Sequence, residues 1–282
     1  MLNHYFMRFP GFTKKALTLS YDDGNVEDIR LVEIMNRYGI KGTFNLNSSA
    51  YTEGVQLYHH PRLDRQAIMD LLKDSPHEIA IHGYYHPFME QLPQGTAAWQ
   101  IVKDRENLEQ MFDTIVRGMA YPMGTYDDQV IAAARQCGIA YARTTTITHQ
   151  FELPEDWYRL EGTCRNISPD LMDLAEQFLS LDPQYAPKLF TLWGHSYEFR
   201  KNDGWTLIED FCRKMGHHQD IWYATVIEIH DYIEAFRQIR SSVNGQRIFN
   251  PTSQTLYLES NGENMILNPG ESLLLHTKMQ AD

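Results

Sequence analysis

Short apolar runs alternate with longer amphipathic segments from about residue 15 to about residue 240, and this alternation leaves few folds open to the chain. Residues 16–20, 42–46 and 78–82 have the length and content of buried strands, whereas residues 26–38 and 97–115 have helical spacing. Repeated strand–helix units join parallel strands through crossover helices. The pattern therefore predicts an α/β fold, a distorted (β/α) barrel of about seven mostly parallel strands.

The strand–helix pattern continues up to residue 240, and a different pattern follows it. Turn signals at Asn244-Gly245, Asn261-Gly262 and Pro269-Gly270 separate short apolar runs near the end of the chain. We therefore expect a barrel domain over residues 1–240 and a small β-rich appendage over 241–282, which packs on the barrel because it has little core of its own. Further strands are expected at 117–121, 139–146, 189–193, 222–227, 247–249, 255–258 and 272–275, and further helices at 126–137, 205–215 and 229–240.

Charge and hydropathy argue against several kinds of partner. Acidic residues outnumber basic ones by 37 to 25, so the net charge of -12 repels phosphate backbones and no nucleic-acid partner is expected. No apolar run approaches the ~20 residues of a membrane helix, and residues 1–10 lack the apolar core of a secretory signal. We expect no membrane partner and a cytoplasmic protein, in which three cysteines without CxxC spacing stay reduced.

Polar clusters directly follow four of the predicted strands. In barrels of this kind the chemistry lies at the carboxyl ends of the strands, so these clusters should meet at one end of the molecule. They are Asp22-Asp23-Gly24, His82 to His86, Pro122-Met123-Gly124 and His195.

Two of these clusters have the composition of a metal site. Asp22 and Asp23 leave a strand end on opposite sides, so one can bind a metal while the other accepts a proton. His82 and His86 can reach one ion if their segment forms a helical turn, and Asp23 would complete a three-ligand site open to water. Zinc is the expected divalent ion, although cobalt, manganese and nickel suit the same ligands. A helix-capping Asp turn and a pair of surface histidines are the structural alternatives.

His195 provides a second proton-transfer group at the same end of the barrel. A lone His at a strand end is structural about as often as it is catalytic. Attack by water and departure of an amine or alcohol need a base and an acid, and Asp22 and His195 can supply them.

Together these clusters resemble the polysaccharide deacetylase family, carbohydrate esterase family 4, which has a NodB-type domain. Residues 20–24, Ser-Tyr-Asp-Asp-Gly, are similar to the motif Thr-Phe-Asp-Asp-Gly, in which the first Asp is the base and the second binds the metal. Residues 82–86 match the motif His-Ser/Thr-x-x-His, with Gly83 in place of the hydroxyl residue. Residues 192–195 stand where the family has the catalytic-acid His, and the resemblance covers about residues 15–240.

The third family motif departs from its pattern. Ala120-Tyr121-Pro122-Met123 stands where the family has Arg-x-Pro-Tyr, so the Arg that contacts the base is missing. The backbone N–H of Met123 can still bind an oxyanion, because that role needs no side chain. Tyr121 and Trp193 are expected to line the substrate site. The family's Asp-x-x-Asp-Trp motif has no secure counterpart.

Arg143 is the candidate to replace the missing Arg. It follows Tyr141-Ala142 on the next predicted strand, so its side chain can reach the same end of the barrel as Ala120. We predict hydrogen bonds of ~2.7–3.2 Å from Arg143 to Asp22, which a planar guanidinium suits. An ordinary surface Arg is the alternative.

The resemblance implies a hydrolase of carbon–nitrogen bonds other than peptide bonds. The leading hypothesis is a metal-dependent enzyme that removes N-acetyl or O-acetyl groups from a carbohydrate, with Asp22 as base and His195 as acid. One alternative keeps the fold but hydrolyses a cyclic ureide or imide. Another is an inactive sugar-binding relative, although a binding module has no need of a metal-and-base set. Oligomeric state, the sugar and its chain length are left open.

Overall fold

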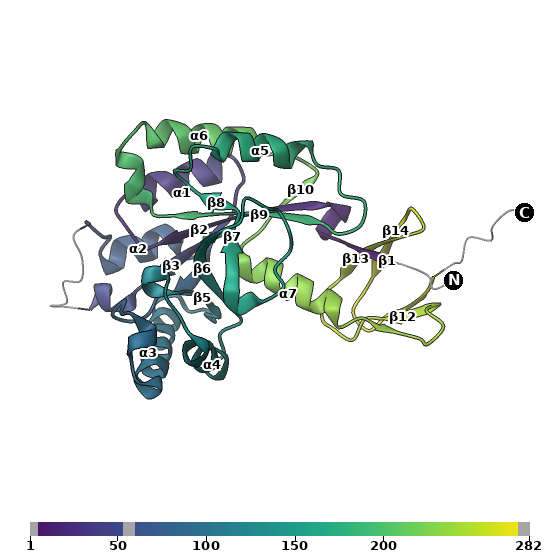
Figure 1. Ribbon diagram of the computed structural model, residues 1–282, viewed down its shortest axis with the longest axis horizontal. Coiled ribbons are helices and arrows are strands. Elements are labelled where there is room, and N and C mark those ends of the chain that lie inside the picture. The colour runs from purple at the N-terminus through teal and green to yellow at the C-terminus, as the bar shows by residue number, and fades with distance from the viewer. Residues whose placement is uncertain (1–4, 53–59, 276–282) are drawn as a thin grey trace, which may run out of the picture.

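The computed structural model describes residues 5–52 and 60–275, in which eight parallel strands curve into a nearly closed barrel (Figure 1). Their order is β7-β6-β5-β4-β3-β2-β9-β8, and β10 pairs in parallel with the start of β2. The predicted α/β barrel is therefore confirmed. The strands are β2 (Lys15–Asp22), β3 (Gly42–Leu46), β4 (Glu78–Ile81), β5 (Gly118–Ala120), β6 (Tyr141–Ile147), β7 (Leu160–Gly162), β8 (Cys164–Arg165), β9 (Lys188–Gly194) and β10 (Ile221–Tyr223).

One short stretch of chain links the two edges of this sheet. β7 pairs with β6, and β8, only one residue further along, pairs with β9. Between them, the backbone N–H of Thr163 donates to the carbonyl of Thr191 at 2.8 Å. The barrel is nearly closed because residues 160–165 bring its two edge strands together. Neither β7 nor β8 was expected from the sequence, since two or three residues carry no periodicity.

Amphipathic helices cover the outer face of the barrel, and the main core lies between the helices and the sheet (Figure 1). In the described residues, no helix has both the length and the hydropathy to span a membrane. The helices are α1 (Asp28–Arg37), α2 (Arg65–Leu72), α3 (Gln94–Phe112), α4 (Asp128–Gln136), α5 (Leu171–Ser180), α6 (Gly204–Met215) and α7 (Val226–Arg237). Short 3₁₀ helices are η1 (Pro10–Phe12), η2 (Ser48–Tyr51), η3 (Met89–Gln91), η4 (Pro122–Gly124), η5 (Trp157–Arg159) and η6 (Ser196–Arg200).

Two details of the expected secondary structure are wrong. The strand expected over 222–227 ends at Tyr223, because Thr225 and Glu228 form a capping box that starts α7. In this box the Glu228 carboxylate accepts from the Thr225 N–H at 2.8 Å, and the Thr225 hydroxyl accepts from the Glu228 N–H at 3.3 Å. The sequence analysis also did not identify α2 and α5.

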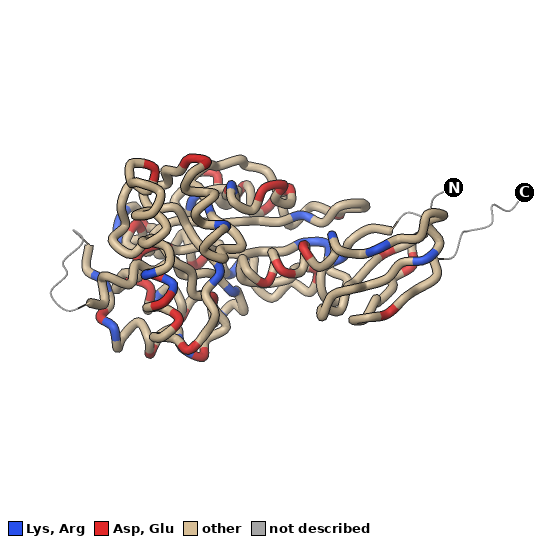
Figure 2. The backbone as a smooth tube through the Cα atoms, turned by 90° about the horizontal axis from the view of Figure 1, so that it is seen from below, with Lys and Arg blue, Asp and Glu red and all other residues tan. Residues whose placement is uncertain are grey.

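The C-terminal region forms two small antiparallel sheets that extend from one end of the barrel (Figures 1 and 2). One sheet takes a strand from the start of the chain, because β1 pairs with β13. The Tyr232 hydroxyl of α7 donates to the Arg8 carbonyl at 2.6 Å and accepts from the Tyr257 N–H at 2.8 Å. Residues 1–4, 53–59 and 276–282 of the two expected domains lie outside the described residues. The strands are β1 (Tyr5–Arg8), β11 (Arg240–Ser241), β12 (Arg247–Phe249), β13 (Leu256–Ser260), β14 (Glu263–Leu267) and β15 (Ser272–Leu274).

Candidate metal centre and active site

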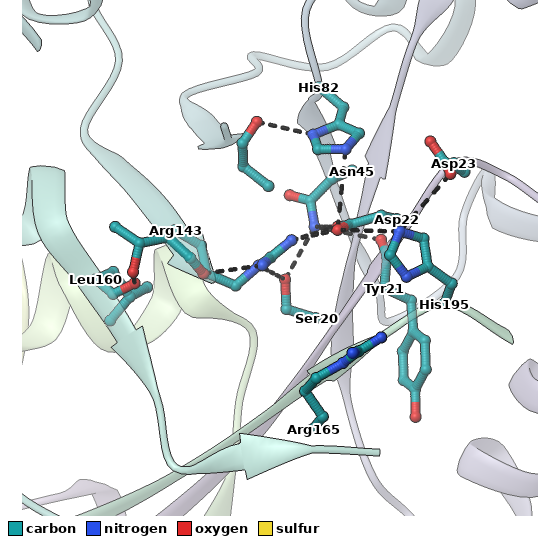
Figure 3. Close-up of polar contacts among 12 residues, drawn as sticks. Ser20, Tyr21, Asp22, Asp23, Asn45, His82, Arg143, Leu160, Arg165 and His195 are labelled. Carbon is teal, nitrogen blue, oxygen red and sulfur yellow. Dashed lines mark hydrogen bonds and ion pairs between the residues drawn. The ribbon is translucent and has the colours of Figure 1, made fainter. Parts of the chain in front are cut away.

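The carboxyl end of β2 positions the two aspartates. Asp22 is the last residue of a strand that is buried throughout, and Asp23 and Gly24 then take left-handed backbone conformations, with φ of +84° and +65°. A Cβ on Gly24 would lie 2.4 Å from the Tyr51 hydroxyl oxygen, so this sharp turn requires glycine. The Asn25 side-chain amide donates to the Asp22 carbonyl at 3.1 Å. The turn ends the strand and separates the two carboxylates (Figure 3).

Asp22 is a buried carboxylate held by donors on two other strands. Arg143 Nη2 donates to Asp22 Oδ1 at 2.6 Å and to Oδ2 at 2.5 Å, and Asn45 Nδ2 donates to Oδ1 at 2.9 Å (Figure 3). Burial alone would raise the pKa of this carboxyl group, but the Arg143 guanidinium bonded to it outweighs that effect. Its pKa therefore lies well below the usual value, and Asp22 is ionised at neutral pH.

Arg143 reaches Asp22 from β6, the strand beside β5, which carries Ala120 in place of the family's motif Arg. It is the register partner of Ala120 in the pairing of β6 with β5. The side chain is 2% exposed, and its guanidinium lies 4.7 Å from the ring centroid of Trp193. Arg143 Nε also donates to Ser20 Oγ at 3.2 Å. The alternative of a surface Arg is therefore wrong. The guanidinium lies next to Asp22, as the sequence analysis predicted.

His82 and His86 bring two ring nitrogens together. Their Nε2 atoms are 3.1 Å apart, and His82 Nδ1 is 2.8 Å from the Ala120 carbonyl oxygen. That carbonyl can only accept, so it assigns the proton of His82 to Nδ1 and leaves a lone pair on Nε2. Burial lowers the pKa of both imidazoles, that of His86 to about 3, so both are neutral at neutral pH.

The two histidines converge through an irregular turn and not through the helical turn that their spacing would otherwise require. His82 directly follows β4, and Gly83 and His86 have φ of +73° and +52°. The His86 N–H closes the turn on the Gly83 carbonyl at 3.0 Å. A Cβ at Gly83 would lie 2.7 Å from Pro122 Cγ, which explains why glycine replaces the family's hydroxyl residue here.

Asp23 completes a set of three candidate metal ligands. Ligand atoms of Asp23, His82 and His86 all lie within 4.8 Å of one another. In the described residues, this is the cluster of His and Asp side chains that could hold a metal ion. A tetrahedral zinc ion with bonds of 2.0–2.1 Å holds two nitrogens roughly 3.3 Å apart, close to the separation of the two imidazoles. Two neutral imidazoles and a carboxylate therefore fit a divalent cation, and these three residues would hold it.

Arg62 connects this ligand set to the loop before α2, and the sequence analysis missed it. Its Nη2 donates to Asp23 Oδ1 at 2.7 Å, and its Nη1 donates to Asn47 Oδ1 at 2.9 Å. The Asn47 side-chain amide in turn donates to the Gly83 carbonyl at 2.8 Å. The chain Arg62–Asn47–Gly83 thus fixes the Asp23 carboxylate relative to the histidine turn. No motif marks a single Arg in a loop, so the sequence offered no signal for it.

Asp104 of α3 binds the backbone next to the candidate metal ligands. Its Oδ1 accepts from the Ser48 N–H at 2.7 Å and its Oδ2 accepts from the His82 N–H at 3.1 Å. The side chain is fully buried, and burial raises its pKa to about 7. A carboxylate at a core position of a long helix is the signal that sequence reasoning could have used.

His195 lies across the site from the histidine turn. Its Nε2 is 3.9 Å from Asp22 Oδ2 and 3.8 Å from Asp23 Oδ2 (Figure 3). Glu198 accepts from the His195 N–H at 3.2 Å, and its other oxygen lies 3.9 Å from His195 Nδ1. Arg165 pairs with the same carboxylate. Of the two roles that its place after His195 suggested, lining the mouth of the site or supporting His195, Glu198 has the second, on the side away from Asp22.

The three residues expected to line the substrate site lie in different surroundings. Met123 has φ of +58° in η4 and an exposed side chain. Tyr121 is buried, and its hydroxyl donates to a backbone carbonyl of η5 at 2.9 Å. Trp193 is buried beside two guanidinium groups, those of Arg143 at 4.7 Å and Arg165 at 5.1 Å from its ring centroid. Their contact with substrate stays a prediction.

Comparison with known proteins identifies the family of this arrangement. Residues 10–142 match the family described as polysaccharide deacetylase. The chain contains a polysaccharide deacetylase family domain. Chitin deacetylase 1 of Cryptococcus neoformans is 26% identical over 184 residues, which are 63% of this chain and 36% of that protein. The uncharacterized protein YlxY of Bacillus subtilis is 30% identical over 133 residues, 46% of this chain and 38% of that protein. The chain thus spans well under half the length of these relatives.

Solved structures share the deacetylase fold at low identity. PuuE allantoinase superposes with a TM-score of 0.56 and 12% identity, over 79% of this chain and 91% of that one. A carbohydrate esterase family 4 pseudoenzyme from Bacillus anthracis gives 0.50 and 19%, over 77% and 66%. At this identity both likenesses show the fold alone.

Replacing Arg62 with Gln should weaken zinc binding by about 10- to 100-fold, the usual effect of losing a partner that orients a metal ligand. The side chain is 9% exposed and bonded to Asp23, so its loss frees that carboxylate to rotate. Competition against a chromophoric chelator measures the affinity. Arg65→Gln, an exposed residue of α2, is the matched control. Equal zinc affinity in wild type and Arg62→Gln would contradict this role.

Proposed function

We propose that this domain is a metal-dependent hydrolase that removes an N-acetyl or O-acetyl group from a carbohydrate. One observation carries the proposal: Asp22, a buried and ionised carboxylate, has Oδ2 3.9 Å from both His82 Nε2 and His195 Nε2. A candidate base therefore lies between a candidate metal ligand and a candidate acid. A protein that only binds sugar has no need of that arrangement.

Each side chain of the site has a distinct task in this reaction. A divalent ion held by Asp23, His82 and His86 would supply Lewis-acid polarisation of the acetyl carbonyl and a water of lowered pKa. Asp22 accepts the proton of the attacking water, and Arg143 keeps that carboxylate oriented and ionised.

The acid and the oxyanion contact complete the reaction. His195 gives a proton to the departing nitrogen or oxygen, so that the leaving group departs as a neutral amine or alcohol. The backbone N–H of Met123, at the carboxyl end of β5, is the candidate donor to the oxyanion. Both remain proposals for this chain.

A substrate panel tests the proposed activity against its two alternatives. Zinc-loaded protein is incubated with N-acetylated oligosaccharides, O-acetylated oligosaccharides and a cyclic ureide, and acetate and ring-opened product are measured. We expect acetate from at least one acetylated sugar and none from Asp23→Ala. Ring opening without acetate release would replace the proposed substrate with a ureide. An absence of both products would identify an inactive relative.

Replacing Arg143 with Lys should move the acidic limb of the pH dependence of kcat/KM to higher pH. Arg143 holds the pKa of Asp22 below its usual value, so the base form persists into acid. A lysine cannot reproduce the guanidinium contacts, so the pKa of Asp22 rises and the base becomes protonated at higher pH. Arg159→Lys, a half-exposed Arg away from Asp22, is the control. An unchanged acidic limb in Arg143→Lys would contradict the assignment.

A further inference from the structure

The register of β2 with β9 ends one residue before the candidate base and the candidate acid. Tyr21 and Gly194 are the last register partners, and Asp22 and His195 follow them directly. Beyond that pair the sheet no longer fixes where His195 lies relative to Asp22. Proton transfer by both groups requires a fixed geometry, so contacts outside the sheet must supply it.

A chain of hydrogen bonds links the backbone of Asp22 to the residue after His195. The Asn25 side-chain amide donates to the Asp22 carbonyl at 3.1 Å, and the Asp28 N–H donates to the Asn25 carbonyl at 3.0 Å. The Ser196 hydroxyl donates to Asp28 Oδ1 at 2.5 Å. The turn after β2 and the 3₁₀ helix after β9 are therefore joined through the side chains of Asp28 and Ser196.

Asp28 is a fully buried acidic residue at the start of α1. Asp is seldom fully buried unless it is paired, and both Asp28 and Ser196 are 0% exposed. The second carboxyl oxygen, Oδ2, is buried without a hydrogen-bond partner in the part of the chain that the structure describes. An unsatisfied buried oxygen costs folding free energy. A role in the site therefore explains this side chain better than a contribution to stability does.

Asn166 holds the carbonyl side of the candidate acid. Its side-chain amide donates to the His195 carbonyl at 3.2 Å, and its own N–H donates to the Trp193 carbonyl at 2.9 Å. Gly194 leaves room for this contact, because a Cβ there would lie 2.2 Å from Asn166 Oδ1. With the backbone fixed on both sides of His195, the ring can point only along a few rotamers.

We propose that Asp28 and Ser196 are positioning residues that hold His195 where it can protonate the leaving group. This inference deepens the proposed function and rests on it. Asp28 is fully buried, so it acts through Ser196 on the backbone of His195, whose Nε2 lies 3.9 Å from Asp22 Oδ2. A displacement of ~1 Å at such a group can cost on the order of 10²-fold in rate.

The leaving group distinguishes a positioning role from a merely structural one. A sugar amine or alkoxide needs a proton to depart, whereas 4-nitrophenolate leaves 4-nitrophenyl acetate without one. Ser196→Ala should therefore lower kcat/KM for the best acetylated sugar of the substrate panel about 10- to 100-fold more than kcat/KM for 4-nitrophenyl acetate. Asp28→Asn keeps an oxygen that can accept from Ser196, so it should retain most of the wild-type ratio. Ser260→Ala, at a buried serine of β13, is the control.

A double variant keeps the test valid if the single variant does not fold. Ser196→Ala alone leaves the buried Asp28 without its donor, which destabilises the protein. Asp28→Leu combined with Ser196→Ala removes both partners at little cost in stability. The double variant should show the same lowered ratio of sugar to ester turnover, and thermal unfolding checks that it is native.

Crystal structures separate this inference from the proposed function. In the double variant, the His195 ring should move by roughly 1 Å from its wild-type place or occupy two rotamers. That movement supports the positioning role even if no substrate releases acetate, a result that would reject the hydrolase. An equal ratio of sugar to ester turnover in wild type and double variant overturns the inference but keeps the hydrolase. An unmoved His195 in the double variant also overturns it.

Discussion

Asp22→Asn should lower kcat/KM by about 10² to 10⁴ while leaving zinc stoichiometry unchanged, the usual range for loss of a general base. Asn has nearly the same shape as Asp and can still accept one bond from Arg143, but it cannot take a proton from water. Asp22 accepts a proton and does not bind the metal, so kcat/KM should fall while the zinc content stays the same. Steady-state kinetics and elemental analysis on the same preparation measure both.

Two controls are needed for this variant. The substitution leaves the Arg143 charge buried without a carboxylate, which destabilises a fold, so thermal unfolding must show that the protein is native at the assay temperature. Asp182→Asn, whose side chain is 75% exposed, controls for the chemical change. Near-normal turnover in both Asp22→Asn and His195→Ala would remove the base and acid from the mechanism.

Asp23→Ala and His82→Ala should each reduce bound zinc from about one ion per chain to near none after dialysis, since a three-ligand site loses its geometry with any ligand. Acetate release should fall with it. His218→Ala is the control, because His218 follows α6 and its Nε2 contacts the Lys214 carbonyl at 2.8 Å. Elemental analysis reports the metal content. Full zinc content in either variant would place the metal elsewhere.

The sequence predicted the parts of the site that lie at the ends of long buried strands. Asp22 ends an eight-residue strand without an exposed position and Asp23 follows it directly, so their place in the barrel follows from the pattern alone. Arg143 could be predicted because parallel strands in register bring Ala120 and Arg143 side by side. Both inferences used regular structure, whose geometry is fixed.

The parts that the sequence did not predict depend on irregular backbone. The turn from His82 to His86 uses left-handed residues, which spacing alone does not distinguish from a helical turn. Arg62 and Asn47 reach the site from loops, where no periodicity relates sequence position to direction. Their contacts arise from tertiary packing between distant segments.

The position of the metal tests the central claim most directly. Anomalous diffraction at the zinc edge, from crystals of zinc-loaded protein, locates the ion independently of activity. The account predicts one strong peak about 2.0–2.3 Å from a carboxylate oxygen of Asp23 and from Nε2 of His82 and of His86. A peak bonded to other residues, or no peak within ~4 Å of these three side chains in zinc-saturated crystals, would contradict it.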